Sequence, residues 1–556
     1  MVSMARTVSR REALRWAASA TLVGALTPAL LAACGSSSDA VREQDELDVA
    51  IIGGGPTGLY SAYRLLTGTA RSGSPVGNPG LRVGVFEASS RLGGRIWSVA
   101  TPGAPHLMAE FGGMRFLRTQ EIVPRLIDAL GLPSVPATES NGRNFVHLRG
   151  ARFREGQYRD PQVVPYDLPR AEQGLTPAEL LLRGITRYVP NAATMTPSQW
   201  TTVKASASFD GELLRNQGYW NLMANALSPE GYALMRDGIG YPISAENWNA
   251  VETMQQMSVD FGPDATFRAV VGGLMRLPLT LAAIARQAGA AIHLSSTAVA
   301  IAPASGGGSL VTIAAADGST ITVKARRVIL AIPSDPMRQL ASTSPLLQDA
   351  PFEHALDAIG TRPSTKLMLG FEDPWWTSLG IVGGSSITDL PANRIWYFGA
   401  EEGAPGGVPG NRRSLLMCYT DSSNAEYWDG YQSEADAAGS PAPRKAPPRM
   451  IQSVRDQLAE VHGVDVPEPY WSGFIDWSSL PYGNAFHAWN VHADSGQIIP
   501  YLRSPFDGTG ISVAADCWSP SQDFIESGLT VAEGLLQSEY RLEPPPWLAP
   551  GLGIST

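Results

Sequence analysis

The sequence predicts an α/β fold that opens on a Rossmann-like dinucleotide-binding unit. A short, mostly apolar run at 47–52 leads directly into the motif Gly53-Gly54-Gly55-Pro56-Thr57-Gly58. Apolar residues between Leu59 and Leu66 then recur at helical spacing. A buried strand, a glycine-rich turn and a helix in this order are typical of dinucleotide-binding proteins.

The composition is that of a globular protein with more than one domain. The chain has 556 residues, of which 44% are apolar and 17% charged, so it can bury several cores and is not a disordered or coiled-coil chain. A net charge of −10 argues against a nucleic-acid partner. The three cysteines and seven histidines show no CxxC or HxxxH spacing, so we expect no metal site.

Each residue of the glycine motif has a separate task in such a site. Gly53 permits the tight turn, Gly55 lets backbone approach a pyrophosphate, and Gly58 lets the helix pack against the strand. Pro56 and Thr57 begin the helix, whose N-terminus faces the anion.

The next strand, 81–86, ends at Glu87, whose carboxylate is placed to bond a ribose 2′-hydroxyl. The interval between motif and acid is longer than usual, and the Gly/Ser/Pro-rich segment 71–80 accounts for this as a loop insertion. A glycine-rich turn in some other α/β fold remains the alternative.

The N-terminus is typical of an export signal. Residues 1–33 contain the pair Arg10-Arg11 and then an uncharged stretch too weak and short for a confident membrane span. The stretch ends at Leu31-Ala32-Ala33-Cys34-Gly35, which resembles a bacterial lipobox. We expect twin-arginine export, a lipid anchor at Cys34, a tether over 34–46 and a periplasmic or cell-surface location. An ordinary signal peptide is the alternative.

A resemblance to a known family begins after the second strand. Arg91-Leu92-Gly93-Gly94-Arg95 resembles the Arg-x-Gly-Gly-Arg segment of flavin-containing amine oxidases. The resemblance implies FAD, with backbone donors of Ala88 and Gly94 near the cofactor and with Arg91 and Arg95 as phosphate-binding guanidinium groups.

Later blocks follow in the order that the family shows. Residues 270–278 and 328–333 resemble its second FAD-binding block, in which backbone near Val299 would meet adenine. Asp516 would bond ribityl or pyrophosphate oxygens, and a helix from about Ile525 to Leu536 would point its N-terminus at the flavin.

The resemblance implies a Rossmann-like FAD-binding domain assembled from three sequence segments, a mixed-sheet substrate domain and a helical insertion. The expected segments are the signal 1–33, the tether 34–46, FAD-binding parts 47–115, 263–335 and 505–540, substrate-domain parts 116–149 and 336–504, the insertion 150–262 and a tail 541–556.

Lys366 is the predicted partner of flavin N5. It lies in Pro363–Trp376, which is similar to a family segment whose lysine contacts N5 through a water molecule. A cation there would act electrostatically on the reduced flavin and on dioxygen.

The segment around Arg115 predicts the substrate class. Gly112-Gly113-Met114-Arg115 looks like the Gly-Ala-Met-Arg segment of L-amino-acid oxidases and tryptophan 2-monooxygenase, whose arginine clamps the substrate carboxylate. The resemblance places Gly112, Gly113 and Met114 at the cofactor as well. A bidentate arginine–carboxylate pair would aim the α-hydrogen at the flavin. A structural ion pair is the alternative role for Arg115.

A tyrosine is expected beside this clamp. Trp396 and Tyr397 face opposite ways on one strand, so only one can reach the carboxylate, and Tyr397 is chosen because its hydroxyl can donate. Core packing is expected for Trp477, His487, Trp489 and Trp518, with a place in the pocket lining as the alternative for each.

Two phenylalanines match the family's aromatic cage. Phe486 and Phe524 would orient a neutral amine. Ala485 stands where some relatives carry a flavin-linked cysteine, so FAD is expected to bind non-covalently. Asp523 replaces the usual glycine before the cage residue and could receive an ammonium group or turn away.

Together these features predict an FAD-dependent L-amino-acid oxidase that uses dioxygen and releases a 2-oxo acid, ammonia and hydrogen peroxide, and that forms a homodimer. Three alternatives stay open: an amino-acid 2-monooxygenase, an oxidase of non-carboxylated amines, and a non-catalytic flavoprotein or surface-tethered binding protein.

Overall fold

The computed structural model describes residues 46–76, 80–138, 140–242, 246–262, 265–432, 443–478, 482–483, 485–522 and 524–548. The predicted export signal, the lipidated Cys34 and Asp523 lie outside these residues. Within the described ranges, no helix combines the length and the apolar character needed to cross a membrane.

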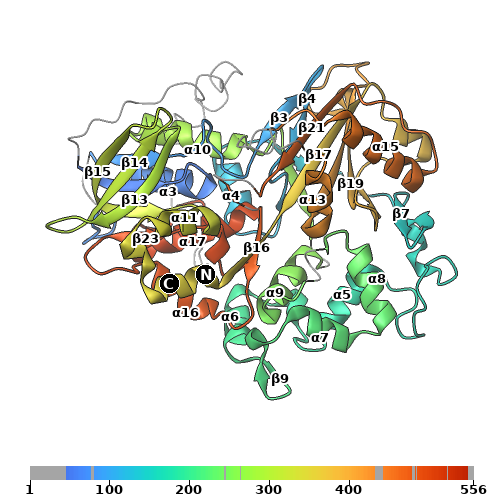
Figure 1. Ribbon diagram of the computed structural model, residues 1–556, viewed down its shortest axis with the longest axis horizontal. Coiled ribbons are helices and arrows are strands. Elements are labelled where there is room, and N and C mark those ends of the chain that lie inside the picture. Colours follow the sequence, from blue (N-terminus) through green and yellow to red (C-terminus); the bar gives the residue numbers. More distant parts are fainter. Residues whose placement is uncertain are drawn as a thin grey trace, which may run out of the picture.

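A seven-stranded sheet forms the predicted dinucleotide-binding unit (Figure 1). Its central strand β1 pairs in parallel with β2 on one side and β15 on the other. The strand order is β12-β2-β1-β15-β14-β13, with β23 beside β15, so three separated parts of the chain meet in one sheet, as predicted. The strands are β1 (Leu47–Ile52), β2 (Val83–Phe86), β12 (Ala291–His293), β13 (Ser296–Pro303), β14 (Ser309–Ala315), β15 (Thr320–Leu330) and β23 (Ile511–Val513).

Both faces of this sheet are covered by helices. Val49 and Ile51 of β1 belong to one core, and the alternate residues Ala50 and Ile52 belong to the other. The first core includes α3 (Pro56–Thr67), α10 (Arg276–Gln287) and α17 (Phe524–Ser538). The second includes α11 (Ser334–Ser342), α12 (Ala350–Asp357) and α16 (Ser495–Leu502).

A second seven-stranded sheet has the order β21-β17-β20-β19-β18-β7-β8. Its strands are β7 (Phe145–Leu148), β8 (Ala151–Arg154), β17 (Ser364–Phe371), β18 (Ser385–Thr388), β19 (Arg394–Ala400), β20 (Ser414–Asp421) and β21 (Trp471–Asp476). One face packs on α15 (Pro448–His462), and the other packs on the hairpin of β3 (Ser98–Thr101) and β4 (Ala104–Glu110). α13 (Ser422–Asp429) follows β20.

The predicted insertion is largely helical and lies below the second sheet (Figure 1). Its helices share one apolar core that includes Leu180, Trp200, Met223 and Met254. Thr176 and Thr196 cap two of them through capping boxes, which satisfy the first backbone N–H groups. The elements are α5 (Pro177–Thr186), α6 (Pro197–Ser206), α7 (Tyr219–Ala226), α8 (Pro229–Gly238) and α9 (Ala250–Asp260), with β9 (Ser208–Phe209) and β10 (Glu212–Leu213).

Two predicted boundaries differ from the packing. The boundary at 149/150 divides the hairpin β7–β8, which belongs entirely to the second sheet. Ile122 and Leu126, of a segment assigned to the substrate domain, bury their side chains in the first core, because α4 (Val123–Ala129) presents its apolar side to that core. Short sheets join the units: β5 (Phe116–Leu117), β6 (Ser134–Pro136) and β11 (Phe267–Val270), and β16 (Ile359–Arg362) with β22 (Phe486–Trp489).

Candidate active site

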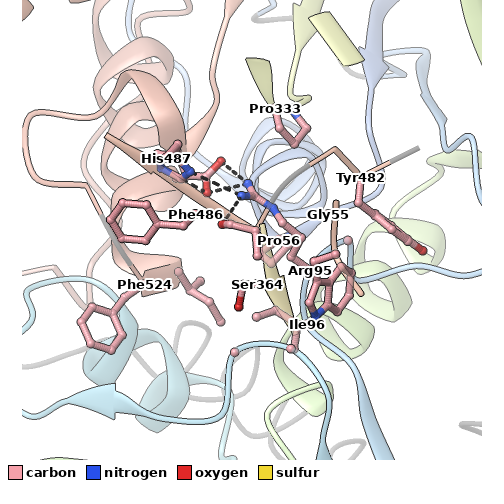
Figure 2. Close-up of a pocket in the computed structure, with 18 of the residues that line it drawn as sticks. Gly55, Pro56, Arg95, Ile96, Pro333, Ser364, Tyr482, Phe486, His487 and Phe524 are labelled. Carbon is pink, nitrogen blue, oxygen red and sulfur yellow. Dashed lines mark hydrogen bonds and ion pairs between the residues drawn. The ribbon is translucent and has the colours of Figure 1, made fainter. Parts of the chain in front are cut away.

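A cavity of about 610 Å³ extends from the glycine motif to the helical insertion. The first sheet contributes Gly53 and Gly55, the second contributes Lys366 and Trp396, and α9 contributes Met257. Figure 2 shows part of its lining, with Gly55 and Pro56 near Arg95 and with Phe486 and Phe524 on one side. Segments that are far apart in the sequence therefore meet around one space.

The glycine loop has the geometry that a dinucleotide requires. Gly53 has a φ of +111°, which side-chain-bearing residues rarely adopt. A Cβ on Gly58 would lie 2.0 Å from the carbonyl oxygen of Gly53, so only glycine allows α3 to approach β1 this closely. A Cβ on Gly55 would meet only the Cα of Gly94, at 3.8 Å, so the backbone there is open to a phosphate at the N-terminus of α3.

Glu87 is held rigidly at the end of β2 and lines the cavity. Its Oε2 accepts a hydrogen bond from the Gly54 N–H at 2.6 Å, and its Oε1 accepts two from Ser89 at 2.7 and 2.9 Å. Further along the cavity wall, the pairing of β13 with β14 is irregular between Ala298 and Ala300, at Val299. Both placements fit the predicted contacts with a dinucleotide.

Arg95 and Asp516 bind each other in the cavity wall. Nη2 of Arg95 lies 2.6 Å from each carboxylate oxygen of Asp516, and Nη1 donates to the Ala485 carbonyl oxygen at 3.0 Å (Figure 2). Burial raises the pKa of Asp516, but the charges of Arg95 and His487 outweigh it and hold this pKa below its usual value. The two predicted cofactor ligands thus form an ion pair that positions both beside the flavin-binding end.

Arg91 does not line the cavity, contrary to the prediction. Its guanidinium donates to the backbone carbonyl oxygens of Leu92, Gly94 and Ile96 and stacks on Trp97 at 3.6 Å. Both Nη atoms are thus engaged by carbonyl oxygens of the loop itself. Arg91 therefore shapes the Gly93-Gly94 turn and does not supply a phosphate ligand.

Lys366 projects from β17 into the cavity wall and is buried. Its Nζ donates to the carbonyl oxygens of Glu110 and Gly112. Burial lowers the pKa of Lys366 to about 7, against the opposing effect of the Glu110 charge. Burial likewise raises the pKa of Glu110 to about 7, although its carboxylate accepts hydrogen bonds from Ser98 and from the Leu274 N–H.

Arg115 lines the cavity between two aromatic rings. Its guanidinium carbon lies 3.5 Å from the centroid of Phe267 and 4.6 Å from that of Trp396. Phe267 in turn contacts Phe524, with ring centroids 6.2 Å apart. Flat aromatic faces thus hold the planar cation in place at the cavity wall.

The choice of Tyr397 is wrong. Its hydroxyl is directed into the core on the other face of the sheet, where it donates to Ser386 Oγ at 2.7 Å and lies 2.5 Å from Nε2 of His462. Trp396 lines the cavity instead, and its buried indole nitrogen has no hydrogen-bond partner among the described residues. Strand alternation correctly separated the two residues but could not tell which face adjoins the cavity.

Phe486 and Phe524 both line the cavity, as the cage prediction requires. Trp477 and His487 line it as well and are at the same time buried, so both roles considered for them are observed. The Trp477 indole donates to the Phe111 carbonyl oxygen at 2.8 Å. An aromatic surface therefore surrounds the reaction space.

Most predicted site residues share this one space. The cavity is lined by Gly53, Gly55, Pro56, Thr57, Glu87, Ala88, Gly94, Arg95, Gly112, Gly113, Met114, Arg115, Val299, Lys366, Phe486, Asp516, Phe524 and Ile525. The sequence reasoning missed Arg394, Tyr419 and Phe267, and also Tyr241 and Gln256 of the insertion, for which no sequence signal existed. Among the described residues, no cluster of histidine, cysteine and acidic side chains could hold a metal ion.

The comparisons with known proteins agree with this arrangement. The chain is 25% identical over 92% of its length to aplysianin-A of Aplysia kurodai, covering 93% of that protein, and 25% identical over 82% to achacin of Lissachatina fulica, covering 85% of it. It is 26% identical over 69% of its length to an L-amino-acid oxidase of Bothrops jararacussu, covering 71% of that enzyme.

Solved structures share the fold. Wild-type putrescine oxidase bound to putrescine matches with a TM-score of 0.64 at 19% identity, covering 88% of this chain and 97% of the other. Cyclohexylamine oxidase from Brevibacterium oxydans has a TM-score of 0.64 at 18% identity, covering 89% and 99%. The model of the flavin containing amine oxidoreductases matches residues 56–536. The chain therefore belongs to the family of flavin containing amine oxidoreductases.

Proposed function

We propose that the protein is an FAD-dependent L-amino-acid oxidase, which converts an amino acid and dioxygen to the 2-oxo acid, ammonia and hydrogen peroxide. The observation that carries this proposal is the position of Arg115, stacked between Phe267 and Trp396 in the cavity that also holds Lys366 and the glycine loop. The substrates of simple amine oxidases have no carboxylate that such a cation could bind. Several relatives named as L-amino-acid oxidases support the same reading.

The side chains have distinct tasks in this reaction. Arg115 binds the substrate carboxylate and fixes the α-carbon, while the neutral amine lies against Phe486 and Phe524, whose rings exclude water. A bound flavin, the family's cofactor, would supply the two-electron acceptor for the hydride of the Cα–H bond, with dioxygen as the final acceptor. The resulting imino acid hydrolyses in water, and no protein base is needed if the amine binds unprotonated.

Two features support FAD held without a covalent bond. The loop at Gly53–Gly58, the N-terminus of α3 and Glu87 suit the pyrophosphate and ribose of a dinucleotide. Ala485, where a covalent link would need a thiol, carries no nucleophile. Release of intact FAD on denaturation in acid, with no flavin left on the polypeptide, is the expected outcome.

An anaerobic screen of the twenty L-amino acids tests the activity. Loss of the yellow flavin absorbance with at least one of them, followed in air by equimolar 2-oxo acid and peroxide, is expected. An amide and carbon dioxide as products would identify a 2-monooxygenase instead. Equal turnover of the amino acid and its decarboxylated amine would identify an amine oxidase, and no bleaching by any substrate would contradict an enzymatic role.

The export signal and a homodimer are also part of the proposal. The twin arginine at 10–11 supports export of the folded, flavin-loaded protein, and the lipobox-like segment that ends at Cys34 supports its anchoring on the outer face of a membrane. Loss of membrane association in Cys34→Ala, with the protein still exported, is expected. Light scattering of the soluble protein lacking residues 1–34 measures its oligomeric state, and a monomer would contradict the dimer.

A further inference from the structure

A second arginine, Arg394, lines the same cavity as Arg115. It stands at the start of β19, two residues before Trp396, so both side chains lie on the same face of the sheet. Its guanidinium carbon lies 4.7 Å from the Trp396 ring and 4.5 Å from the ring of Tyr241, which follows α8 of the insertion. Two guanidinium groups, those of Arg115 and Arg394, therefore lie within 4.7 Å of the Trp396 ring centroid.

The spacing of the two arginines suits a short bridging ligand. Because both guanidinium carbons are close to one indole ring, their separation cannot exceed the sum of 4.6 and 4.7 Å. In a bidentate pair the carboxylate carbon lies about 4 Å from the guanidinium carbon. The two carboxylate carbons of an extended glutamate are about 5 Å apart. One dicarboxylic amino acid can thus contact both guanidinium groups.

Arg394 retains donors for such a contact. Nε donates to Ser385 Oγ at 2.9 Å, and Nη1 donates to the Ile239 carbonyl oxygen at 3.2 Å. A guanidinium group has five N–H donors, so these two neutral acceptors leave some unused and leave the charge uncompensated. None of the described carboxylates forms an ion pair with Arg394.

Among the described residues, four carboxylates also line the cavity: Glu87, Glu155, Asp260 and Asp516. Glu87 accepts from Gly54 and Ser89, Asp516 binds Arg95, and Glu155 accepts a hydrogen bond from Ser140. Asp260 also has an interaction partner. Lys366, Arg115 and Arg394 line the same space around aromatic rings. A ligand with two carboxylates offers an acceptor to each of the two arginines.

We propose that the substrate is an L-amino acid with a carboxylate on its side chain, of the size of aspartate or glutamate, and that Arg394 binds that side-chain carboxylate. This inference rests on the proposed oxidase function and names its substrate class. Arg115 then holds the α-carboxylate near the flavin end, and the Trp396 ring contacts both guanidinium groups. Arg394 is thus the specificity-determining residue.

The test compares each acid with its uncharged isostere on the purified holoenzyme: glutamate with glutamine and aspartate with asparagine. We expect kcat/KM for at least one acid to exceed that of its amide at least 30-fold, roughly the scale of a buried charge pair. Arg394→Gln should lower kcat/KM for the acid by about that factor and for the amide by less than about 3-fold. Arg394→Lys should recover part of the loss, because charge remains but the planar fork does not.

Arg362→Gln is the matched control. Arg362 also stacks on a tryptophan, at 4.7 Å from the Trp248 ring, but it does not line the cavity. Its replacement should leave the acid-to-amide ratio unchanged. A fall in both acid and amide turnover by the same factor in Arg394→Gln would overturn the assignment and make Arg394 a structural residue.

The outcomes separate this inference from the proposed function. If the wild-type protein oxidises neutral or basic amino acids better than acidic ones, the substrate class is wrong while the oxidase function stands. If no L-amino acid bleaches the flavin without oxygen, the oxidase function itself fails. Equilibrium titration of the flavin spectrum with glutarate, an unreactive dicarboxylate, gives a readout besides turnover: tighter binding to the wild type than to Arg394→Gln supports the site, and equal binding contradicts it.

Discussion

The ammonium nitrogen of Lys366 donates a hydrogen bond to the backbone carbonyl oxygen of Glu110 at 3.1 Å, and both side chains are buried. The backbone carbonyl of Glu110 thus fixes the position of the Lys366 ammonium group. The negative charge of the Glu110 carboxylate raises the pKa of Lys366. Burial disfavours both ionised forms, and mutual attraction restores them in part. The pair therefore titrates near neutral pH, where neither group would titrate in water.

The first prediction concerns this titration. The Lys366 cation is present below its pKa of about 7 and is lost as the pH rises. Because the Glu110 charge raises that pKa, Glu110→Gln should lower it further and move the loss of oxygen reactivity to lower pH. The pH profile of flavin reoxidation in stopped flow measures this. Glu372→Gln, an exposed partner of Arg413, serves as control, and identical profiles for Glu110→Gln and wild type would contradict the coupling.

The second prediction concerns the carboxylate clamp. Arg115→Ala should lower kcat/KM by about 2–5 kcal/mol in transition-state free energy, the scale for removing one partner of a buried charge pair. Arg115→Lys should retain less than half of that binding energy, since lysine lacks the fork. Arg268→Gln is the control, because its guanidinium bonds Ser134 and does not line the cavity. Unchanged activity of Arg115→Ala on its best amino acid would refute the clamp.

The third prediction separates Tyr397 from its neighbour. Tyr397→Phe should keep kcat within about 3-fold of wild type but lower the free energy of unfolding by about 1–3 kcal/mol, because buried groups of Ser386 and His462 lose a partner. Trp396→Leu should show the reverse pattern, a large loss in kcat/KM. Denaturant unfolding and steady-state kinetics of both variants measure these effects. A kinetic defect in Tyr397→Phe alone would contradict the assignment and indicate that Tyr397 acts in the active site.

The fourth prediction concerns His462. Burial lowers its pKa to about 4, so the folded state favours the neutral ring. A depressed folded-state pKa contributes stability that is present above the unfolded value near 6.5 and is lost as the pH falls toward 4. The wild type should lose about 3 kcal/mol over that window relative to His462→Gln. Urea titrations at pH 7 and pH 4 measure this difference in the free energy of unfolding. The variant His354→Gln, at an exposed histidine, is the control and should behave as wild type. Equal losses of stability in all three proteins would contradict the assignment to His462.

The fifth prediction concerns the glycine loop. Gly58→Ala places a Cβ 2.0 Å from backbone oxygen and should displace α3, costing about 1–3 kcal/mol and most of the bound flavin. Gly403→Ala is the matched control, since its added Cβ meets nothing within 4 Å. The ratio of flavin to protein absorbance after gel filtration is the measurement. Full flavin content in Gly58→Ala would show that the close helix–strand approach is not required.

Local features of the site could be predicted from the sequence. The turn at Gly53, the helix after it and the acid at Glu87 follow one another within a single strand–turn–helix–strand unit, so neighbouring residues determine their geometry. Lys366 and Arg115 were also placed correctly in the cavity, because each lies in a segment that resembles the family's. The helix expected near 525–536 was observed at 524–538.

Long-range contacts could not be predicted in the same way. Tyr241 reaches the cavity from the insertion and stacks on Arg394 of a strand more than a hundred residues away, so no local pattern links them. The resemblance to the family implied a phosphate contact for Arg91, but in the folded loop its guanidinium donates to three backbone carbonyl oxygens. Which acceptors a guanidinium group binds therefore depends on the groups that the packed chain brings next to it.

By itself, the amino-acid sequence determined a strand–loop–helix of the kind typical of dinucleotide-binding proteins, the order of the segments and the residue types available for oxidation. Only the tertiary structure decided which side of β19 faces the cavity, that Arg95 pairs with Asp516, and that two arginines contact Trp396. The physical reason is that backbone conformation depends on near neighbours, whereas the surroundings of a side chain depend on which distant elements pack against it.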